Sequence, residues 1–395
     1  MPVAVIGAGI VGLTSAVALQ NKGYDVTVFE AADHPAMGAS YGNAGLIAAA
    51  SAEAWSSPAA ILAALKWIGR DDAPLKVHLA WDWERLRWLS KFAWSALSYQ
   101  TNTKALAELS LAARGPLQKM AQDAAADFDF VRGGVLDLYG TQADRKTAER
   151  VVGWMGQVGV PRTFVEPETL RQLEPTLPPS WAFATHSAED FTGDSKAFCE
   201  DLVTWLQTQG ATLTFGRTVM QLIPKDRGVL VVDQEGRHGF DQVVVANGLG
   251  AGQLSKPLGD RLDIYGVKGY SLTLNLTKAQ AALAPRHGLL DHEAKIAVST
   301  LGHRLRVAGT AEIGAKDLAL SPARLRPLYQ WVQGTLPDLA DAPAEEWAGF
   351  RPMRAQIQPL LKPSRASDRI LYNVGHGHLG WTFAAATAEN LMAFF

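Results

Sequence analysis

The scarcest residue type in this chain of 395 residues is cysteine, because Cys199 is the only one. A single cysteine excludes an intramolecular disulfide and a cysteine-rich metal cluster. The formal net charge of only −2 argues against a nucleic-acid partner, which requires a basic face. Long apolar runs are also lacking, because the uncharged stretches 34–52 and 370–388 are broken by Gly, Asn, Ser and His. Neither stretch predicts a membrane span.

Glycine, in contrast, is abundant, and three glycines stand in the opening segment. An apolar strand, Val3–Ile6, leads into the sequence Gly7-Ala8-Gly9-Ile10-Val11-Gly12, which opens a helix expected to run from about Ile10 to Lys22. A second strand then ends in Glu30, 18 positions after Gly12.

This order of strand, glycines, helix, strand and acid is typical of a dinucleotide site. Gly7 permits the tight turn, Gly9 lets backbone approach a pyrophosphate, and Gly12 lets the helix pack on the strand. Glu30 is expected to hold a ribose hydroxyl, and the helix N-terminus supplies N–H groups for the phosphates. A tight turn between strand and helix without a ligand is the alternative.

Residues 1–21 carry no charge, and Ala16-Val17-Ala18 resembles a signal-peptidase site. However, no Lys or Arg precedes the apolar stretch, and the glycines stand where a nucleotide loop needs them. We therefore expect a cytoplasmic chain, or one that faces the cytoplasm.

The last segment repeats the pattern of strand, glycine turn and helix start over Asn373–Thr382. A second helix N-terminus aimed at the same ligand suits a flavin, since reduction leaves negative charge near N1 and the C2 carbonyl. NAD would not require this second site. The two turns together favour a flavin cofactor.

The order of elements predicts an α/β protein of two interleaved domains. A Rossmann-like domain that binds the dinucleotide is expected to take residues 1–50, 186–255 and 345–395. Residues 51–185 and 256–344 are expected to form an antiparallel-sheet α+β substrate domain.

Individual elements are predicted as well. An amphipathic helix is expected over Asp194–Gly210, a strand over Ile370–Val374, and a hairpin-like strand over Phe130–Tyr139 around Gly133-Gly134.

Six further motifs carry a family resemblance: Ser40–Gly45, Thr192–Asp194, Val267–Thr273, Lys295–Ala297, Arg304–Val307 and Gly375–Thr382. Together they resemble the D-amino-acid oxidase superfamily of FAD-dependent amine oxidoreductases, over nearly the whole chain. Within it, the similarity is greatest to the bacterial D-amino-acid dehydrogenase small subunits. The resemblance implies FAD, bound non-covalently.

The resemblance also implies which residues line the cofactor. They are Gly7, Gly9, Ile10, Gly12, Glu30, Ser40, Asn43, Ala44, Gly45, Leu46, Val219, Gly248, Gly377, His378, Leu379, Gly380, Trp381 and Thr382. Residues 7–12 and Ser40 would lie near the phosphates, and Glu30 at the adenosine ribose. Residues 43–46 would lie along the isoalloxazine, Val219 at the adenine, and residues 377–382 at the pyrimidine edge.

The candidate for binding substrate is Arg351. Gly349-Phe350-Arg351-Pro352 resembles the segment of D-amino-acid oxidases whose arginine binds the substrate carboxylate. Related dehydrogenases continue Arg-Pro with Thr-Pro-Asp-Gly, whereas this chain continues with Met353-Arg354. A guanidinium fork holds a carboxylate in a bidentate way that lysine cannot. A structural salt bridge is the alternative.

Four further side chains are candidates for the catalytic site. Tyr270 would donate its phenol to the carboxylate, or else pack as a strand aromatic in the core. Tyr265 and Arg306 could also contact substrate, although Arg304 and Arg306 share a strand face and one of them could be solvated. His378 could touch flavin or substrate. The pair His376 and His378 lacks a third ligand at recognisable spacing, so we expect no metal site.

The resemblance implies oxidation of a small-molecule amino-acid substrate. A hydride passes from Cα of a D-amino acid to flavin N5, and water hydrolyses the imino acid to a 2-oxo acid and ammonia. Electrons would pass to a quinone-type or other acceptor. Two alternatives stay open: a secondary-amine or imino-acid oxidoreductase acting on glycine, sarcosine, proline or hydroxyproline, and a non-catalytic flavin-binding partner subunit.

Tryptophan is concentrated in one segment, because six of the twelve lie within residues 55–94: Trp55, Trp67, Trp81, Trp83, Trp88 and Trp94. Core packing around the site would explain them. Peripheral association with the cytoplasmic face of the inner membrane is the alternative, since Trp favours membrane interfaces.

Overall fold

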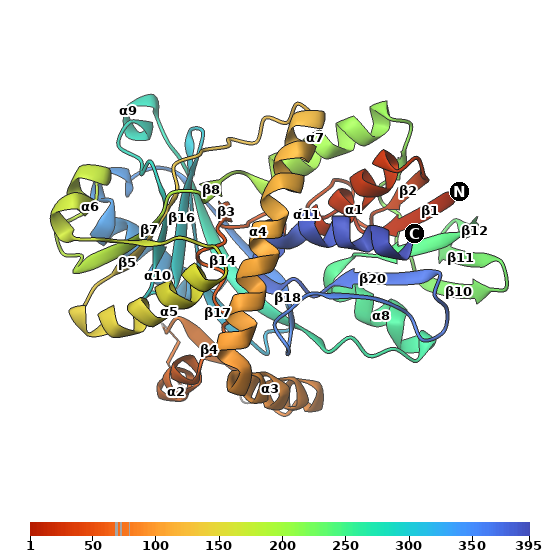
Figure 1. Ribbon diagram of the computed structural model, residues 1–395, viewed down its shortest axis with the longest axis horizontal. Coiled ribbons are helices and arrows are strands. Elements are labelled where there is room, and N and C mark those ends of the chain that lie inside the picture. Colours follow the sequence, from red (N-terminus) through yellow and green to blue (C-terminus); the bar gives the residue numbers. More distant parts are fainter. Residues whose placement is uncertain (68–69, 72, 79) are drawn as a thin grey trace.

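The computed structural model describes residues 1–67, 70–71, 73–78 and 80–395. The chain builds two large sheets that lie side by side, and the long helix α4 (Tyr99–Asp123) runs across the molecule between them (Figure 1). Both chain termini lie beside the smaller of the two sheets (Figure 1).

The smaller sheet has six strands in the order β19-β20-β13-β1-β2-β9. Its strands are β1 (Pro2–Ile6), β2 (Asp25–Phe29), β9 (Thr212–Thr214), β13 (Gln242–Val245), β19 (Leu360–Pro363) and β20 (Ile370–Val374). All neighbours pair in parallel except β19, which runs antiparallel to β20. Their apolar residues are buried on both faces, as parallel strands require.

Different elements pack on the two faces of this sheet. On one face lie the helices α1 (Ile10–Asn21), α7 (Ser195–Thr208) and α11 (Gly380–Leu391), whose apolar side chains form one core with the strands. The other face carries α8 (Ala251–Ser255) and a three-stranded antiparallel sheet, β10 (Gln221–Lys225), β11 (Gly228–Asp233) and β12 (Gly236–Phe240). This is the Rossmann-like arrangement that the glycine motif predicts.

The larger sheet has nine strands, eight of them in the order β18-β14-β17-β16-β15-β5-β7-β6, with β4 paired to β17. They are β4 (Leu75–Val77), β5 (Val135–Tyr139), β6 (Thr163–Val165), β7 (Phe183–Ser187), β14 (Ile264–Asn275), β15 (Gly288–Asp291), β16 (Ile296–Leu301), β17 (Arg304–Ile313) and β18 (Ala344–Arg354). Most pairs are antiparallel, but β15 with β5 and β17 with β4 are parallel.

Helix α10 (Pro322–Thr335) packs its apolar residues on one face of this sheet. The other helices are α2 (Pro58–Lys66), α3 (Trp83–Ser95), α5 (Arg145–Gln157), α6 (Pro167–Leu173) and α9 (Lys278–Ala281). A short antiparallel pair, β3 (Leu46–Ile47) with β8 (Phe191–Thr192), joins the segment after the first glycine loop to the start of α7.

The fold class agrees with the prediction, and three details differ. Strand β18 belongs to the larger sheet, so the Rossmann-like part resumes after Arg354 rather than at 345. The expected hairpin at Gly133-Gly134 is absent from this described segment, since β5 pairs with β15 and β7. The sequence also predicts a final helix from Thr382 onward, whereas helix α11 begins at Gly380. These differences all concern long-range strand pairing or helix ends, where local pattern carries little information.

Candidate functional site

The turn between β1 and α1 forms one end of the candidate site. Gly7 has φ +105°, a conformation that other residues rarely adopt. A Cβ added to Gly12 would overlap the Gly7 carbonyl oxygen, so the helix packs directly on the turn. At Gly9, an added Cβ would meet only Ser40 Oγ, at 3.4 Å. The turn is therefore open beside the positive end of α1, where phosphates bind.

Ser40 and Glu30 both lie beside this turn. The Ile10 N–H donates to Ser40 Oγ over 3.1 Å. The Glu30 carboxylate accepts the N–H of Ala8 over 2.6 Å and that of Ala32 over 2.9 Å. The acid expected at the ribose thus stands beside the glycine loop, and its oxygens have further lone pairs available.

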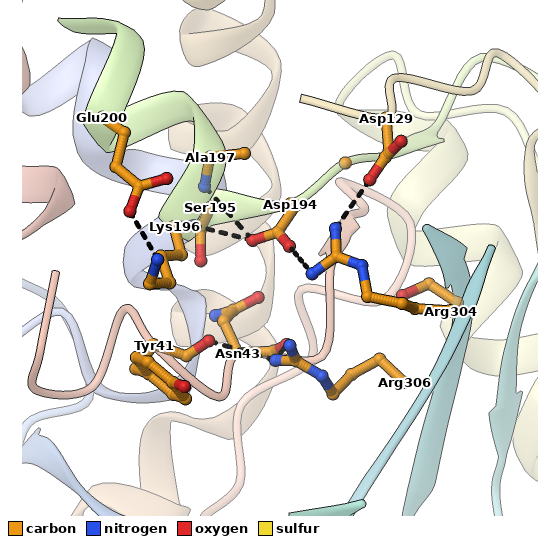
Figure 2. Close-up of polar contacts among 12 residues, drawn as sticks. Tyr41, Asn43, Asp129, Asp194, Ser195, Lys196, Ala197, Glu200, Arg304 and Arg306 are labelled. Atoms are coloured by element: carbon orange, nitrogen blue, oxygen red, sulfur yellow. Dashed lines mark hydrogen bonds and ion pairs between the residues drawn. The ribbon is translucent and has the colours of Figure 1, made fainter. Parts of the chain in front are cut away.

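The loop Tyr41–Gly45 runs from Ser40 across the larger sheet. Arg306 Nη1 donates to the carbonyl oxygens of Tyr41 and Asn43 over 3.1 and 3.0 Å (Figure 2). Ser299 Oγ donates to the Ala44 carbonyl over 2.6 Å. We call the sheet face that carries Arg306 and Ser299 the front face. These contacts fix the loop to that face.

A second set of contacts fixes the start of α7 to the same loop. Asp194 caps the helix by accepting the Lys196 N–H over 2.8 Å, and it pairs with Arg304 Nη1 at 2.9 Å (Figure 2). Arg304 Nη2 also pairs with Asp129 at 2.7 Å. Ser195 Oγ, the first residue of α7, donates to the Ser40 carbonyl over 2.6 Å.

The second glycine turn joins β20 to α11. Gly377 has φ +61°, and a Cβ there would lie 2.7 Å from Met353 Sδ. Trp381 is buried, packs on Phe128 and Phe198, and donates its indole N–H to the Gly193 carbonyl over 3.1 Å. Trp381 can therefore offer a ligand only its backbone. Gly193 in turn donates to the Gly45 carbonyl over 2.9 Å, so these contacts bring the start of α11 close to the loop.

Arg351 lies on the front face of the larger sheet, where its guanidinium covers the backbone of Gly269. Its guanidinium occupies the place that a Cβ on Gly269 would take. Arg351 Nη1 donates to the Thr310 carbonyl over 3.2 Å. No ion pair joins Arg351 to a carboxylate among the residues that the structure describes, and burial lowers its pKa to about 10. A half-buried cation without an acid partner is suited to bind an anionic ligand.

His378 and Trp55 complete the surroundings of Arg351. The Trp55 ring lies 5.7 Å from the Arg351 guanidinium carbon and stacks on the His378 ring with centroids 4.5 Å apart. Burial, together with the charge of Arg351, lowers the pKa of His378 to about 3. The imidazole is therefore neutral near pH 7, and it cannot supply a second positive charge.

Tyr270 lies elsewhere. It follows Gly269 on β14 and points to the opposite face, where it is 1 % exposed in the core beneath α10. Its hydroxyl donates to Glu312 Oε2 over 2.7 Å. The structure thus gives Tyr270 the core position rather than a place beside Arg351. Strand alternation separates the two, and the register could not be read from one strand alone.

The remaining predicted residues have varied places. Tyr265 is half-buried beside Trp88 and donates to Asp82 Oδ2 over 3.1 Å. Val219 packs against the core of the six-stranded sheet. Gly248, with φ +59°, follows β13 next to the first glycine turn, since a Cβ on Gly7 would lie 2.8 Å from Asn247 Cα.

Comparison with known proteins agrees with this geometry. Residues 2–393 match the FAD dependent oxidoreductase (DAO) family. The chain belongs to this family. It is 36 % identical to D-amino acid dehydrogenase 3 of Mesorhizobium japonicum, over 98 % of this chain and 95 % of the relative. It is 33 % identical to the D-amino acid dehydrogenase of Dechloromonas aromatica, over 99 % and 96 %.

Solved structures of an oxidase and a dehydrogenase show the same fold. Glycine oxidase from Geobacillus kaustophilus superposes with a TM-score of 0.76 at 20 % identity, over 99 % of this chain and 93 % of that one. L-proline dehydrogenase from P. horikoshii gives 0.76 at 17 % identity, over 99 % and 91 %. At this identity the likeness concerns the fold alone.

The residues present fit FAD. The turn is open at Gly9, two helix N-termini lie at the glycine turns, and the buried Arg306 forms no ion pair with an acid in the described part of the chain. These features supply donors for phosphates and for a cofactor that gains negative charge on reduction.

Four residues of the site were not predicted: Trp55, Ser299, Thr310 and Trp347. The Trp347 ring fills the space above Gly349 and Gly42, where added Cβ atoms would overlap it. The signal for Trp347 was its spacing, because Trp347, Gly349 and Arg351 alternate onto one strand face. Nothing local to Trp55 or Thr310 indicates their contact with Arg351.

Proposed function

We propose that this protein catalyses the FAD-dependent oxidative deamination of D-amino acids and passes the electrons to a quinone-type acceptor. The observation that carries the proposal is Arg351, a half-buried guanidinium on the front face with no acid partner among the described residues. Support also comes from relatives named D-amino acid dehydrogenases at 31–36 % identity over nearly the full chain.

In this proposal FAD lies between the two glycine turns. Gly7–Gly12 and Ser40 would face the pyrophosphate, Glu30 the ribose, and Val219 and Gly248 the adenosine side. Residues 43–46 would lie along the isoalloxazine, and residues 377–382 would close on its pyrimidine edge. The support is the open turn at Gly9 and the convergence of α1, α11 and the loop after Ser40.

The protein's own part in the chemistry is to hold the substrate. Arg351 would bind the carboxylate through two guanidinium nitrogens. Gly269, which has no side chain, leaves the space that the guanidinium occupies. Bound FAD would supply the hydride acceptor, its N5 atom, and the grip of Arg351 on the carboxylate would orient the substrate Cα toward it. The neutral ring of His378 and the indole of Trp55 would exclude water beside the reacting carbon. The imino acid then hydrolyses to a 2-oxo acid and ammonia.

Anaerobic mixing tests the proposal. The FAD-loaded protein is mixed without oxygen with D-alanine, D-proline, glycine, sarcosine and the L forms, and the flavin absorbance is followed. We expect bleaching by D-amino acids. Bleaching by glycine or sarcosine alone would favour the secondary-amine alternative, and bleaching by dithionite alone would favour a non-catalytic flavin-binding subunit.

The electron acceptor can be tested in the same preparation. A water-soluble quinone analogue added to the reduced protein without oxygen should restore the oxidised spectrum within the time of a turnover. We expect reoxidation by the quinone to be faster than by air-saturated buffer. The reverse order would make the protein an oxidase rather than a dehydrogenase.

We further propose that α3 brings the protein to a membrane surface, where a lipid-soluble quinone resides. Of the tryptophans in residues 55–94, Trp88 is buried, whereas Trp81, Trp83 and Trp94 are 82, 69 and 75 % exposed. Helix α3 lies at the edge of the molecule (Figure 1). No helix in the described ranges combines the length and apolar character needed to cross a bilayer. Tryptophan favours the headgroup region instead.

Co-sedimentation with lipid vesicles tests this surface. Wild-type protein should sediment with vesicles, and the variant Trp81→Gln/Trp83→Gln/Trp94→Gln should stay in the supernatant with unchanged FAD content. The matched control is Trp205→Gln on α7, far from α3. Equal sedimentation of wild type and triple variant would contradict a docking role for α3.

A further inference from the structure

Arg306 is a second guanidinium that forms no ion pair among the described residues, and its contacts point to the cofactor rather than to the substrate. The residue is 4 % exposed on β17. Its Nη1 donates only to carbonyl oxygens, those of Tyr41 and Asn43, and its Nε has no partner (Figure 2). Within the described part of the chain, no carboxylate lies within ion-pair distance of it.

Arg304, two residues earlier on the same strand face, provides the contrast. It pairs with Asp129 at 2.7 Å and with Asp194 at 2.9 Å (Figure 2). Its charge is therefore paired directly with two carboxylates. Arg306 instead donates to carbonyl oxygens, and Asp194 and Glu345 act on its charge without forming an ion pair. Burial lowers the pKa of Arg306, but a guanidinium stays protonated at neutral pH.

A buried charge without an ion-pair partner is costly, and a bound anion would reduce that cost. The two guanidinium groups have different partners. Arg351 donates to the Thr310 carbonyl, whereas Arg306 donates to the loop carbonyls of Tyr41 and Asn43. The contacts of Arg306 therefore favour an anion that lies along the loop over the carboxylate held by Arg351.

We propose that Arg306 is an electrostatic and positioning residue for the flavin, and not a substrate ligand. This inference rests on the proposed function for the course of the loop Tyr41–Gly45 along the isoalloxazine. Bound FAD would supply the hydride acceptor: the substrate Cα–H bond would break, its electron pair would form the N5–H bond, and a displaced pair of ring electrons would leave one negative charge on the pyrimidine ring. Arg306 stabilises that charge and so raises the reduction potential.

The test measures the flavin without substrate. The two-electron midpoint potential and the dissociation constant for sulfite, which adds at flavin N5, are determined for wild type, Arg306→Gln and the control Arg304→Gln. For Arg306→Gln we expect the equilibrium constant for flavin reduction to fall at least about tenfold, which lowers the midpoint potential by about 30 mV. The dissociation constant for sulfite should rise by a similar factor. Arg304→Gln should change either value less than about threefold.

A second readout separates the two possible roles of Arg306. Binding of an inert carboxylate, such as acetate, to the oxidised enzyme should be unchanged in Arg306→Gln and lost in Arg351→Ala. Weaker acetate binding in Arg306→Gln with an unchanged potential would overturn the proposal and make Arg306 a substrate ligand.

A further variant keeps Arg306 in place. Glu345 is an acid near Arg306 that accepts a hydrogen bond from Tyr41 Oη over 3.0 Å. Glu345→Gln removes an opposing charge, so the potential should rise, opposite in sign to Arg306→Gln. A lower or unchanged midpoint potential in Glu345→Gln would contradict the electrostatic role of Arg306. This test remains available if Arg306→Gln does not retain FAD. These measurements use no amino-acid substrate, so they stand or fall separately from D-amino-acid turnover.

Discussion

The prediction with the firmest structural basis concerns Arg351. Replacing it by alanine removes the buried cation that would pair with the substrate carboxylate, and the carboxylate would then enter the pocket unpaired. Breaking a buried ion pair in this way costs about 3–5 kcal/mol. Since about 1.4 kcal/mol corresponds to a factor of ten, substrate affinity should fall by roughly two to four powers of ten.

The assay is an anaerobic titration of the FAD-loaded variant with a D-amino acid and with acetate, followed by flavin absorbance. FAD content should stay near one per chain, because Arg351 contacts the Thr310 carbonyl and neither glycine turn. Arg351→Lys keeps the positive charge but cannot form two parallel hydrogen bonds to a carboxylate. Its affinity for the D-amino acid and for acetate should therefore lie between those of wild type and Arg351→Ala. Arg369→Ala, whose side chain reaches the Asp241 carbonyl, is the control. An Arg351→Ala enzyme with wild-type affinity for acetate would refute the reasoning.

Three further predictions follow from the glycine turns and the buried imidazoles. Gly9→Val should abolish FAD retention, because the added side chain enters the open side of the turn. The circular dichroism spectrum should stay that of the wild type. Full FAD occupancy in the variant would count against the assignment of this turn to the phosphates. Gly12→Ala should lower stability by at least about 1–3 kcal/mol in urea unfolding, because its Cβ overlaps the Gly7 carbonyl, and an unchanged midpoint would be inconsistent with that packing. Burial lowers the pKa of His376 to about 3 in the folded protein. Between about pH 6.5 and pH 3 the unfolded chain therefore binds more protons than the folded chain, and the free energy of unfolding should fall as the pH drops through this range. His376→Asn should flatten that decline, and an identical pH dependence of the unfolding midpoint in the variant would show that His376 does not carry it.

Local pattern was enough to predict the Rossmann-like half. The turn at Gly7 requires a positive φ, and the contact at Gly12 excludes any Cβ, so these glycines mark their own positions in the sequence. The helix over Ser195–Thr208 was equally readable, because Asp194 caps it and its apolar residues recur with helical spacing.

The front face of the larger sheet was harder to predict, because it depends on which strands become neighbours. Arg351 and Tyr270 both resemble residues of a carboxylate site, yet β14 and β18 pair so that Gly269 rather than Tyr270 faces Arg351. Trp55 reaches Arg351 from a segment almost 300 positions away in the chain, and the Thr310 contact lies at an irregularity in the pairing of β14 with β17. Such contacts are set by tertiary packing and leave no periodic signal.

The central claim is that one chain holds FAD between two glycine turns and uses Arg351 to present a D-amino acid to it. Its most direct test is to strip the purified protein of cofactor, add FAD, and titrate the product anaerobically with matched D and L amino acids. We predict stoichiometric FAD binding and bleaching by the D forms. A protein that refuses FAD, or a flavin that only the L forms bleach, would contradict the account.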